Sequence, residues 1–338
     1  MQSIEKKSTV ALFGAGSWGT ALAMQLARNG SIVNLWGHRA EHIDSLISAN
    51  ENIAYLPGIA LGSDIRPTAS IEDCLQDADV VLIAIPSKSF RDFLKSLKPF
   101  INPTVSVFWA SKGFEIESGK LLHELVSEEL PGHSYGVVSG PTFASEVAKG
   151  MPAAITCAGN DNTETEYLAS LLHGSRFRCY TSDDVIGVEL GGALKNILAI
   201  AVGTADGLGF GANTRAALIT RGLAEVMRLG KELEARQETL MGLAGLGDLI
   251  LTCTDDQSRN RRFGLAIGQG KTVEQAVVEV KQTVEGLRAS KAIYLMAQAM
   301  SIELPIMEQT YQVLYHNKKP HDAVKALENR PQRSELTQ

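Results

Sequence analysis

The stretch Phe13-Gly14-Ala15-Gly16-Ser17-Trp18-Gly19-Thr20 decides the fold of this chain. A β-prone run, Thr9 to Phe13, precedes it, and a helix-forming run, Thr20 to Arg28, follows it before Asn29-Gly30. A second β-prone run spans Ile32 to Trp36. A glycine-rich turn between a strand and a helix, with another strand close behind, is typical of a Rossmann unit.

Each glycine of this stretch has a separate task in such a unit. Gly14 permits the tight turn, Gly16 lets the backbone approach a pyrophosphate, and Gly19 lets the helix pack closely on the sheet. The helix start adds free N–H groups and positive partial charge. The sequence therefore predicts a dinucleotide site at Gly14, Gly16 and Gly19.

Strand and helix patterns alternate through the rest of the first half. The strands are expected at Asp79–Ile85, Val105–Ala110, Tyr135–Ser139 and Ala153–Ala158, and the helices at Glu41–Ala49, Phe90–Leu97 and Leu121–Glu129. This alternation predicts an α/β fold with a doubly wound, mainly parallel sheet.

The pattern changes near residue 185, where strand signals nearly end. Helical patterns then follow at Asp184–Asp206, Thr214–Leu233, Thr239–Leu251, Val273–Lys281, Gly286–Met300 and Ile306–Tyr315. We therefore predict two domains, a dinucleotide-binding Rossmann domain at residues 1–185 and an all-α substrate and catalytic domain at residues 186–338.

The bulk composition limits the class of protein. With 338 residues, 44% of them hydrophobic, the chain is long enough for two cores. A net charge of -6 does not support binding of nucleic acid. Four widely spaced cysteines favour neither disulfides nor a metal site, and fit the cytoplasm. The most apolar runs are too short for membrane insertion.

The end of the second strand bears on cofactor choice. A site selective for NAD normally carries Asp or Glu there, to hold the ribose 2′-hydroxyl. This chain has Trp36-Gly37-His38-Arg39 instead. His38 and Arg39 could receive a 2′-phosphate, so we expect NADPH to be preferred and NADH to be accepted as well. The alternative is that both side chains are merely exposed.

A lysine interrupts the small, apolar helix that opens the second domain, in Gly191-Gly192-Ala193-Leu194-Lys195-Asn196. Lysine is rarely buried unless it is paired. Lys195 is either a side chain that reaches solvent from the helix edge or a desolvated ammonium that gives a proton to a ketone oxygen. Asn196 could orient that group. Asp248 could pair with Lys195, or else cap a helix.

Two further basic positions suit an anionic substrate. Ser258-Arg259-Asn260-Arg261-Arg262 is a compact cluster that either binds a phosphate through bidentate arginine or forms a solvated surface turn. Lys112 follows the end of a predicted strand, where an open parallel sheet presents its ligand-binding groups.

Taken in order, these segments resemble the bacterial NAD(P)-dependent glycerol-3-phosphate dehydrogenases, from about Val10 to Lys325. The segments that carry the resemblance are Phe13-Gly14-Ala15-Gly16-Ser17-Trp18-Gly19-Thr20, Leu35-Trp36-Gly37-His38, Ser111-Lys112-Gly113, Ser139-Gly140-Pro141-Thr142-Phe143-Ala144, Gly192-Ala193-Leu194-Lys195-Asn196, Gly245-Leu246-Gly247-Asp248-Leu249 and Ser258-Arg259-Asn260.

The resemblance implies reversible reduction of dihydroxyacetone phosphate to sn-glycerol 3-phosphate, for phospholipid synthesis. It implies a catalytic set with Lys195 as proton donor and acceptor, supported by Asp248, Lys112 and Asn196. The implied cofactor contacts beyond the glycines are Ser17, Trp18, His38, Lys112, Ala144, Arg259, Val284 and Glu285, and the residues after the second strand add Arg39. The implied substrate contacts are Lys112, Gly140, Thr142, Lys195, Asp248, Ser258, Arg259 and Asn260.

Two other classes of protein compete with this interpretation. A β-hydroxyacid dehydrogenase would also combine a Rossmann domain, a helical domain and a catalytic lysine, but would act on a carboxylate. A non-catalytic redox sensor would need the glycine loop but not Lys195. A structural or nucleic-acid-binding protein has no supporting feature. The helical domain could also form a homodimer.

Overall fold

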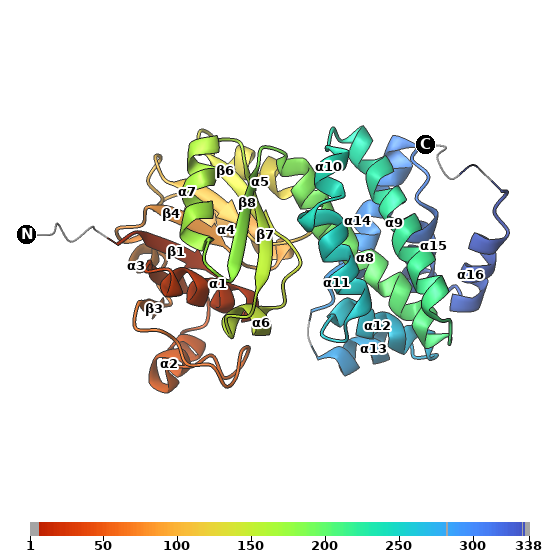
Figure 1. Cartoon of the computed structure of the whole chain (residues 1–338), viewed down its shortest axis with the longest axis horizontal. Helices are drawn as coiled ribbons and strands as arrows, with labels where there is room; N and C mark the ends of the chain where they lie inside the picture. Colours follow the sequence, from red (N-terminus) through yellow and green to blue (C-terminus); the bar gives the residue numbers. More distant parts are fainter. Residues whose placement is uncertain (1–6, 282, 333, 335–338) are drawn as a thin grey trace, which may run out of the picture. The chain divides into compact units, whose positions relative to one another are not determined.

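The computed structural model describes residues 7–281, 283–332 and 334, which form two compact units (Figure 1). The sheet unit contains the described residues up to Lys112 together with Leu122–Val185. The helical unit contains Gly113–Leu121 and the described residues from Ile186 onward.

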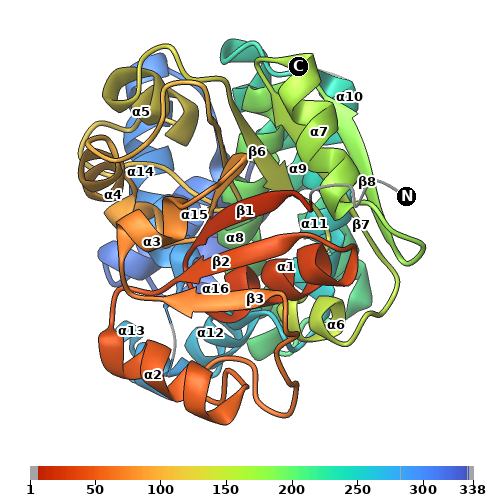
Figure 2. The same ribbon diagram turned by 90° about the vertical axis from the view of Figure 1, so that its left-hand side faces the viewer.

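The sheet unit is built on one eight-stranded sheet of order β3-β2-β1-β4-β5-β6-β7-β8. Neighbouring strands are parallel, except that β7 runs antiparallel to β6. Figure 2 shows β1, β2 and β3 side by side, with α1 beside them. The strands are β1 (Thr9–Phe13), β2 (Ile32–Trp36), β3 (Ile65–Thr68), β4 (Val80–Ile83), β5 (Ser106–Trp109), β6 (Tyr135–Ser139), β7 (Ala153–Gly159) and β8 (Phe177–Ser182).

Helices connect these strands. They are α1 (Ser17–Arg28), α2 (Ala40–Ala49), α3 (Ile71–Leu75), α4 (Phe90–Leu97), preceded by the 3₁₀ turn η1 (Ser87–Ser89), α5 (Leu122–Glu129), α6 (Ala144–Ala148) and α7 (Asn162–Leu172). Every residue of β1 and of β4 is buried, which explains why all of them except Thr9 are apolar rather than alternating with polar residues.

The helical unit contains α8 (Val185–Gly207), α9 (Ala212–Glu232), α10 (Gln237–Leu240), the π-helix η2 (Leu243–Gly247), α11 (Asp248–Thr254), α12 (Arg259–Gly268), α13 (Val273–Val280), α14 (Glu285–Met300), α15 (Pro305–Tyr315) and α16 (Pro320–Glu328).

Helix α8 forms the centre of the helical unit. Leu194, Ile197 and Leu198 are among its fully buried residues and belong to the main core of this unit. By length and composition α8 could cross a membrane, but most residues of its apolar stretch are buried inside the protein. It is therefore the core helix of this unit.

The fold class predicted from the sequence is confirmed: a mainly parallel, doubly wound sheet is followed by a helical region. Apart from one segment, the division of the chain between the two units falls between Val185 and Ile186. The hairpin-like segment Gly113–Leu121 belongs to the helical unit, because Phe114 and Leu121 are buried in its core.

Some elements differ from the prediction. The expected helix Thr239–Leu251 is interrupted by the π-helix, so it consists of α10, η2 and α11. Short or weakly patterned elements were not predicted, namely β3, β8, α3, α6, α7, α12 and α16. Three of them, β3, α3 and α6, have only four or five residues, too few to show a periodic apolar pattern in the sequence.

Candidate active site

The glycine loop after β1 has the geometry of a phosphate cradle. Gly14 has a φ of 126°, and a Cβ there would lie 2.4 Å from the carbonyl oxygen of Ala84. A Cβ on Gly19 would lie 1.9 Å from the carbonyl oxygen of Gly14, so α1 touches the loop backbone. At Gly16, no described atom lies within 4 Å of that position. Two glycines therefore allow close packing, and the third leaves the backbone open.

Helix α1 starts at this open glycine. Its N-cap residue, Gly16, has no side chain to accept a hydrogen bond from the first turn, and the first turn holds no acidic residue. The free N–H groups and the helix dipole favour an anion at this end. The cradle therefore fits the pyrophosphate of a dinucleotide.

The end of β2 carries the two residues predicted to select the cofactor. His38 and Arg39 are both exposed. The Arg39 guanidinium donates a hydrogen bond of 2.7 Å from Nη2 to the Tyr55 hydroxyl. The Ser17 hydroxyl donates to the Tyr55 carbonyl oxygen at 2.8 Å. Tyr55 thus joins the glycine loop to the candidate 2′-phosphate position.

Asn52 supports the loop from behind and was not predicted. Its side chain is buried, and Nδ2 donates to the Ala15 carbonyl oxygen at 3.0 Å and to the Thr20 hydroxyl at 2.8 Å. Both Asn52 and Tyr55 lie in an irregular segment after α2, where no sequence pattern distinguishes them. Only their position in space shows that they brace the loop.

The other predicted residues of the sheet unit lie after strands β5 and β6. Lys112 is half-buried, and Ser111 beside it donates to the Ile85 carbonyl oxygen at 2.6 Å. Gly140 cannot be larger, because a Cβ there would lie 2.8 Å from the Cα of Ile155. Thr142 donates to the Gly140 carbonyl oxygen at 3.3 Å, and Ala144 begins α6.

A buried ion pair joins Lys195 of α8 to Asp248 of α11. Lys195 is 8% exposed and Asp248 is fully buried. The Thr252 hydroxyl also approaches the same carboxylate oxygen of Asp248, at 3.3 Å. The expected pairing is therefore present, and Lys195 does not reach solvent from the helix edge. Asp248 is the first residue of α11 rather than its N-cap.

Glycines allow this pair to form. A Cβ on Gly191 would lie 2.4 Å from the Ala244 carbonyl oxygen, so the π-helix η2 touches the backbone of α8. A Cβ on Gly245 would lie 2.0 Å from the Leu240 carbonyl oxygen. Because η2 lies against α8 one turn before Lys195, Asp248 at the end of η2 reaches the ammonium. Such π-turns are frequent at functional sites.

A polar chain continues from Asn196, the neighbour of Lys195. Asn196 Oδ1 accepts from Asn260 Nδ2 at 2.8 Å, and Asn196 Nδ2 donates to Glu285 Oε2 at 3.3 Å. Asn260 Oδ1 in turn accepts from the Gly286 N–H at 3.0 Å. The structure therefore joins Asn196, Asn260 and Glu285, which lie far apart in the sequence, next to the Lys195–Asp248 pair along α8.

The remaining predicted residues have more varied surroundings. Ser258 is the N-cap of α12 and accepts from the Arg261 N–H at 3.2 Å. Arg259 follows it and is exposed. The Val284 side chain is buried in a small apolar core with Phe263, so it offers a ligand its backbone rather than its side chain.

Among the described residues, no group of three or more acidic, His or Cys side chains could hold a metal.

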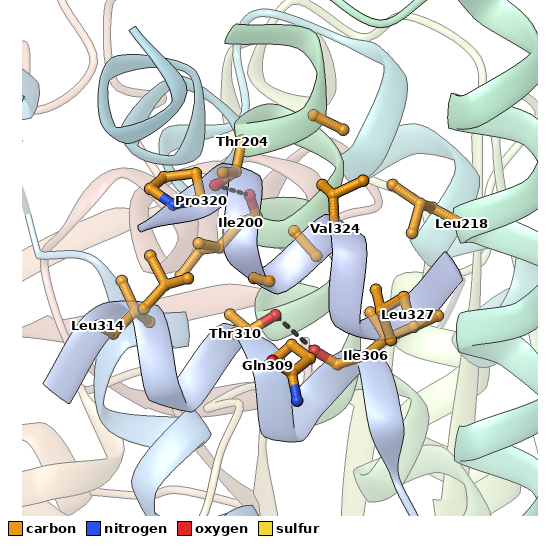
Figure 3. A pocket seen from close by; sticks show the side chains of 14 residues that line it. Ile200, Thr204, Leu218, Ile306, Gln309, Thr310, Leu314, Pro320, Val324 and Leu327 are labelled. Atoms are coloured by element: carbon orange, nitrogen blue, oxygen red, sulfur yellow. Dashed lines mark hydrogen bonds between the residues drawn. The ribbon is translucent and has the colours of Figure 1, made fainter. Parts of the chain in front are cut away.

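A separate cavity of about 50 Å³ lies among α8, α9, α15 and α16 (Figure 3). Its lining is mostly aliphatic, and its hydroxyls face helix backbone: Thr204 donates to the Ile200 carbonyl oxygen, and Thr310 to that of Ile306. None of the predicted site residues lines it. This cavity is therefore not part of the candidate active site.

The dinucleotide cradle and the buried Lys–Asp pair define a class, the two-domain NAD(P)-dependent dehydrogenases. Sequence models of both halves of one family match this chain. The N-terminal model of NAD-dependent glycerol-3-phosphate dehydrogenase matches residues 9–165, and the C-terminal model matches residues 184–325. The chain belongs to the NAD-dependent glycerol-3-phosphate dehydrogenase family.

Individual relatives agree over nearly the whole chain. Glycerol-3-phosphate dehydrogenase [NAD(P)+] from Shewanella halifaxensis (strain HAW-EB4) is 50% identical over 99% of both chains. The glycerol-3-phosphate dehydrogenase structure from Coxiella burnetii is 44% identical and has a TM-score of 0.93, over 96% of this chain and 99% of that chain. D-mandelate dehydrogenase, at 13% identity and a TM-score of 0.60, covers 94% of this chain and 99% of its own and shares the fold alone.

Proposed function

We propose that this chain catalyses the reversible NAD(P)H-dependent reduction of dihydroxyacetone phosphate to sn-glycerol 3-phosphate. The buried Lys195–Asp248 pair is the observation that carries this proposal. An ammonium held beside one carboxylate can give a proton to a neighbouring oxygen. The names of the curated relatives support the substrate.

In the proposed mechanism, Lys195 donates its proton to the carbonyl oxygen of the substrate as that oxygen gains charge. Asp248 keeps the ammonium in place, and Asn196, the next residue of α8, ties that helix to Asn260 and Glu285. Arg259, exposed at the start of α12, binds the phosphate, and Lys112 adds a second cation. When bound, the reduced nicotinamide supplies the hydride. In the reverse direction Lys195 takes the proton back.

The experiment that tests the function measures NADPH oxidation by the purified protein with dihydroxyacetone phosphate, beside NADH. We expect rapid oxidation that depends on the phosphorylated ketone. Folded protein that oxidises neither cofactor with this substrate would contradict the proposal. Activity with 3-keto acids instead would favour a β-hydroxyacid dehydrogenase, and tight NADPH binding without turnover would favour a redox sensor.

We also propose that NADPH is the preferred cofactor, because Arg39 is exposed at the end of β2 and is held there by Tyr55. Arg39→Gln should weaken the apparent affinity for NADPH about 10- to 100-fold, the value of one charge-assisted contact to a phosphate. The KM for NADH should change little, since NADH lacks the 2′-phosphate. Initial rates with both cofactors check this.

Tyr55→Phe provides the matched control, since it removes only the hydroxyl that holds the guanidinium. Its effect on the KM for NADPH should have the same direction and be smaller. If Arg39→Gln weakened NADPH and NADH equally, Arg39 would not contact the 2′-phosphate.

Two further predictions concern the whole protein. We propose a cytoplasmic location, which the free thiols of all four cysteines support. We also propose that the helical unit allows a homodimer, which light scattering of the purified protein tests.

A further inference from the structure

Arg261 is the one residue of the basic cluster Ser258–Arg262 whose charge is buried. Arg259 and Arg262 are exposed, whereas Arg261 is 8% exposed. Its Nη2 donates to Asp206 Oδ2 at 2.7 Å, and Nη1 pairs with Asp256. A buried guanidinium is costly unless it is paired, so this side chain is tied to its partners rather than available to a ligand.

Asp206 joins three helices. Its Oδ2 binds Arg261 of α12, and its Oδ1 accepts from Nε and Nη2 of Arg215 in α9, at 3.2 and 3.0 Å. Asp206 itself lies in the last turn of α8, the helix that carries Lys195. Two arginines from different helices therefore share one carboxylate at the end of α8.

Backbone contact fixes the distance between α8 and α12. A Cβ on Gly203 would lie 2.1 Å from the Arg261 carbonyl oxygen, and one on Gly264 would lie 2.1 Å from the Ile200 carbonyl oxygen. Asn260 and Asn196 add a hydrogen bond of 2.8 Å between the same two helices. Glycine contacts set how closely the helices approach, while the Arg261–Asp206 pair sets how far α12 can slide or turn.

We propose that Arg261 is a positioning residue for the phosphate of the substrate. Through Asp206 it holds the first turn of α12 against α8, so that Arg259, two residues earlier, is presented at a fixed place relative to Lys195. This inference rests on the proposed function, in which Arg259 binds the phosphate and Lys195 acts on the carbonyl oxygen.

The test compares two substrates that differ only in the phosphate, dihydroxyacetone phosphate and dihydroxyacetone. Arg261→Gln should lower kcat/KM for dihydroxyacetone phosphate about 10- to 100-fold, mainly through KM, because a misplaced arginine loses a charge-assisted contact. The much lower kcat/KM for dihydroxyacetone should stay within about threefold of the unmodified enzyme, since that substrate never uses the contact. Arg261→Lys should restore part of the loss.

Arg215→Gln is the matched control. It removes a cation from the same Asp206 carboxylate but leaves α12 paired. Its ratio of kcat/KM values for the two substrates should match that of the unmodified enzyme. Asp206→Asn should change the ratio of kcat/KM values in the same way as Arg261→Gln. It serves as the test variant if Arg261→Gln does not fold.

Two outcomes would overturn the proposal. One is an unchanged ratio of kcat/KM values in Arg261→Gln or its substitute, which includes an equal loss with both substrates. The other is the same change of this ratio in Arg215→Gln. Arg259→Gln separates failure of the inference from failure of the proposed site. If Arg259→Gln leaves the ratio of kcat/KM values unchanged, Arg259 does not bind the phosphate, and Arg261 then has no positioning role for it. If the unmodified enzyme does not prefer the phosphorylated ketone, the proposed function itself is wrong.

Discussion

Lys195→Met should lower kcat by about 100- to 10,000-fold, the usual contribution of a positioned proton donor. Methionine keeps an unbranched side chain in the buried site but cannot donate a proton. The dissociation constant for NADPH should stay nearly unchanged, because the glycine loop and Arg39 belong to the sheet unit and Lys195 to the helical unit. Single-turnover kinetics and a fluorescence titration with NADPH measure the two quantities.

The control for this prediction addresses stability. Lys195→Met leaves the buried Asp248 carboxylate without its cation, and breaking a buried ion pair costs about 3–5 kcal/mol. The double variant Lys195→Met/Asp248→Asn removes both charges, so it should unfold at a higher urea concentration than the single variant. It should remain equally inactive. Near-normal turnover in either variant would remove Lys195 from the chemistry.

Glu225 should make the stability of the helical unit depend on pH. This carboxyl group is buried in α9, and it accepts hydrogen bonds from the N–H groups of Ile306 and Met307, at 2.7 and 3.1 Å. It thereby caps the start of α15. Burial raises the pKa of Glu225 to about 7, although these N–H groups and the charges of Arg228 and Arg330 oppose the shift.

The folded protein holds the proton of Glu225 more tightly than the unfolded chain does, so protonation of Glu225 stabilises the fold. The stabilisation is complete below the unfolded pKa of about 4.5, and it is lost as the pH rises through about 7. A shift of this size corresponds to about 3 kcal/mol. The difference in unfolding free energy between the unmodified protein and Glu225→Gln should therefore change by about that amount between pH 5 and pH 8.

Urea unfolding followed by far-UV circular dichroism measures this difference. All three tryptophans, Trp18, Trp36 and Trp109, lie in the sheet unit, so their fluorescence reports that unit separately. If the difference in unfolding free energy between the unmodified protein and Glu225→Gln stayed constant from pH 5 to pH 8, Glu225 would not titrate in this range.

Patterns that are local in the sequence predicted much of the structure. The strand–glycine–helix order around Gly14 to Gly19 predicted the Rossmann sheet, because turn chemistry and periodicity act over a few residues. The lysine within an apolar helix indicated either an ammonium paired with Asp248 or a side chain that reaches solvent, and the structure shows the pair. Helix α12 was missed, since nothing local distinguishes its polar first turn, Arg259 to Arg262, from a polar loop.

The sequence by itself determined the fold class and the glycine cradle, and it singled out Lys195 without deciding whether that side chain is buried or reaches solvent. Only the tertiary structure decided how the basic cluster is divided, with Arg259 exposed and Arg261 paired with Asp206, 55 residues away in the chain. It also placed Asn52 under the glycine loop and Glu225 at the start of α15. The reason is physical: a charged or polar side chain takes its role from the groups that surround it, and packing alone brings those groups together.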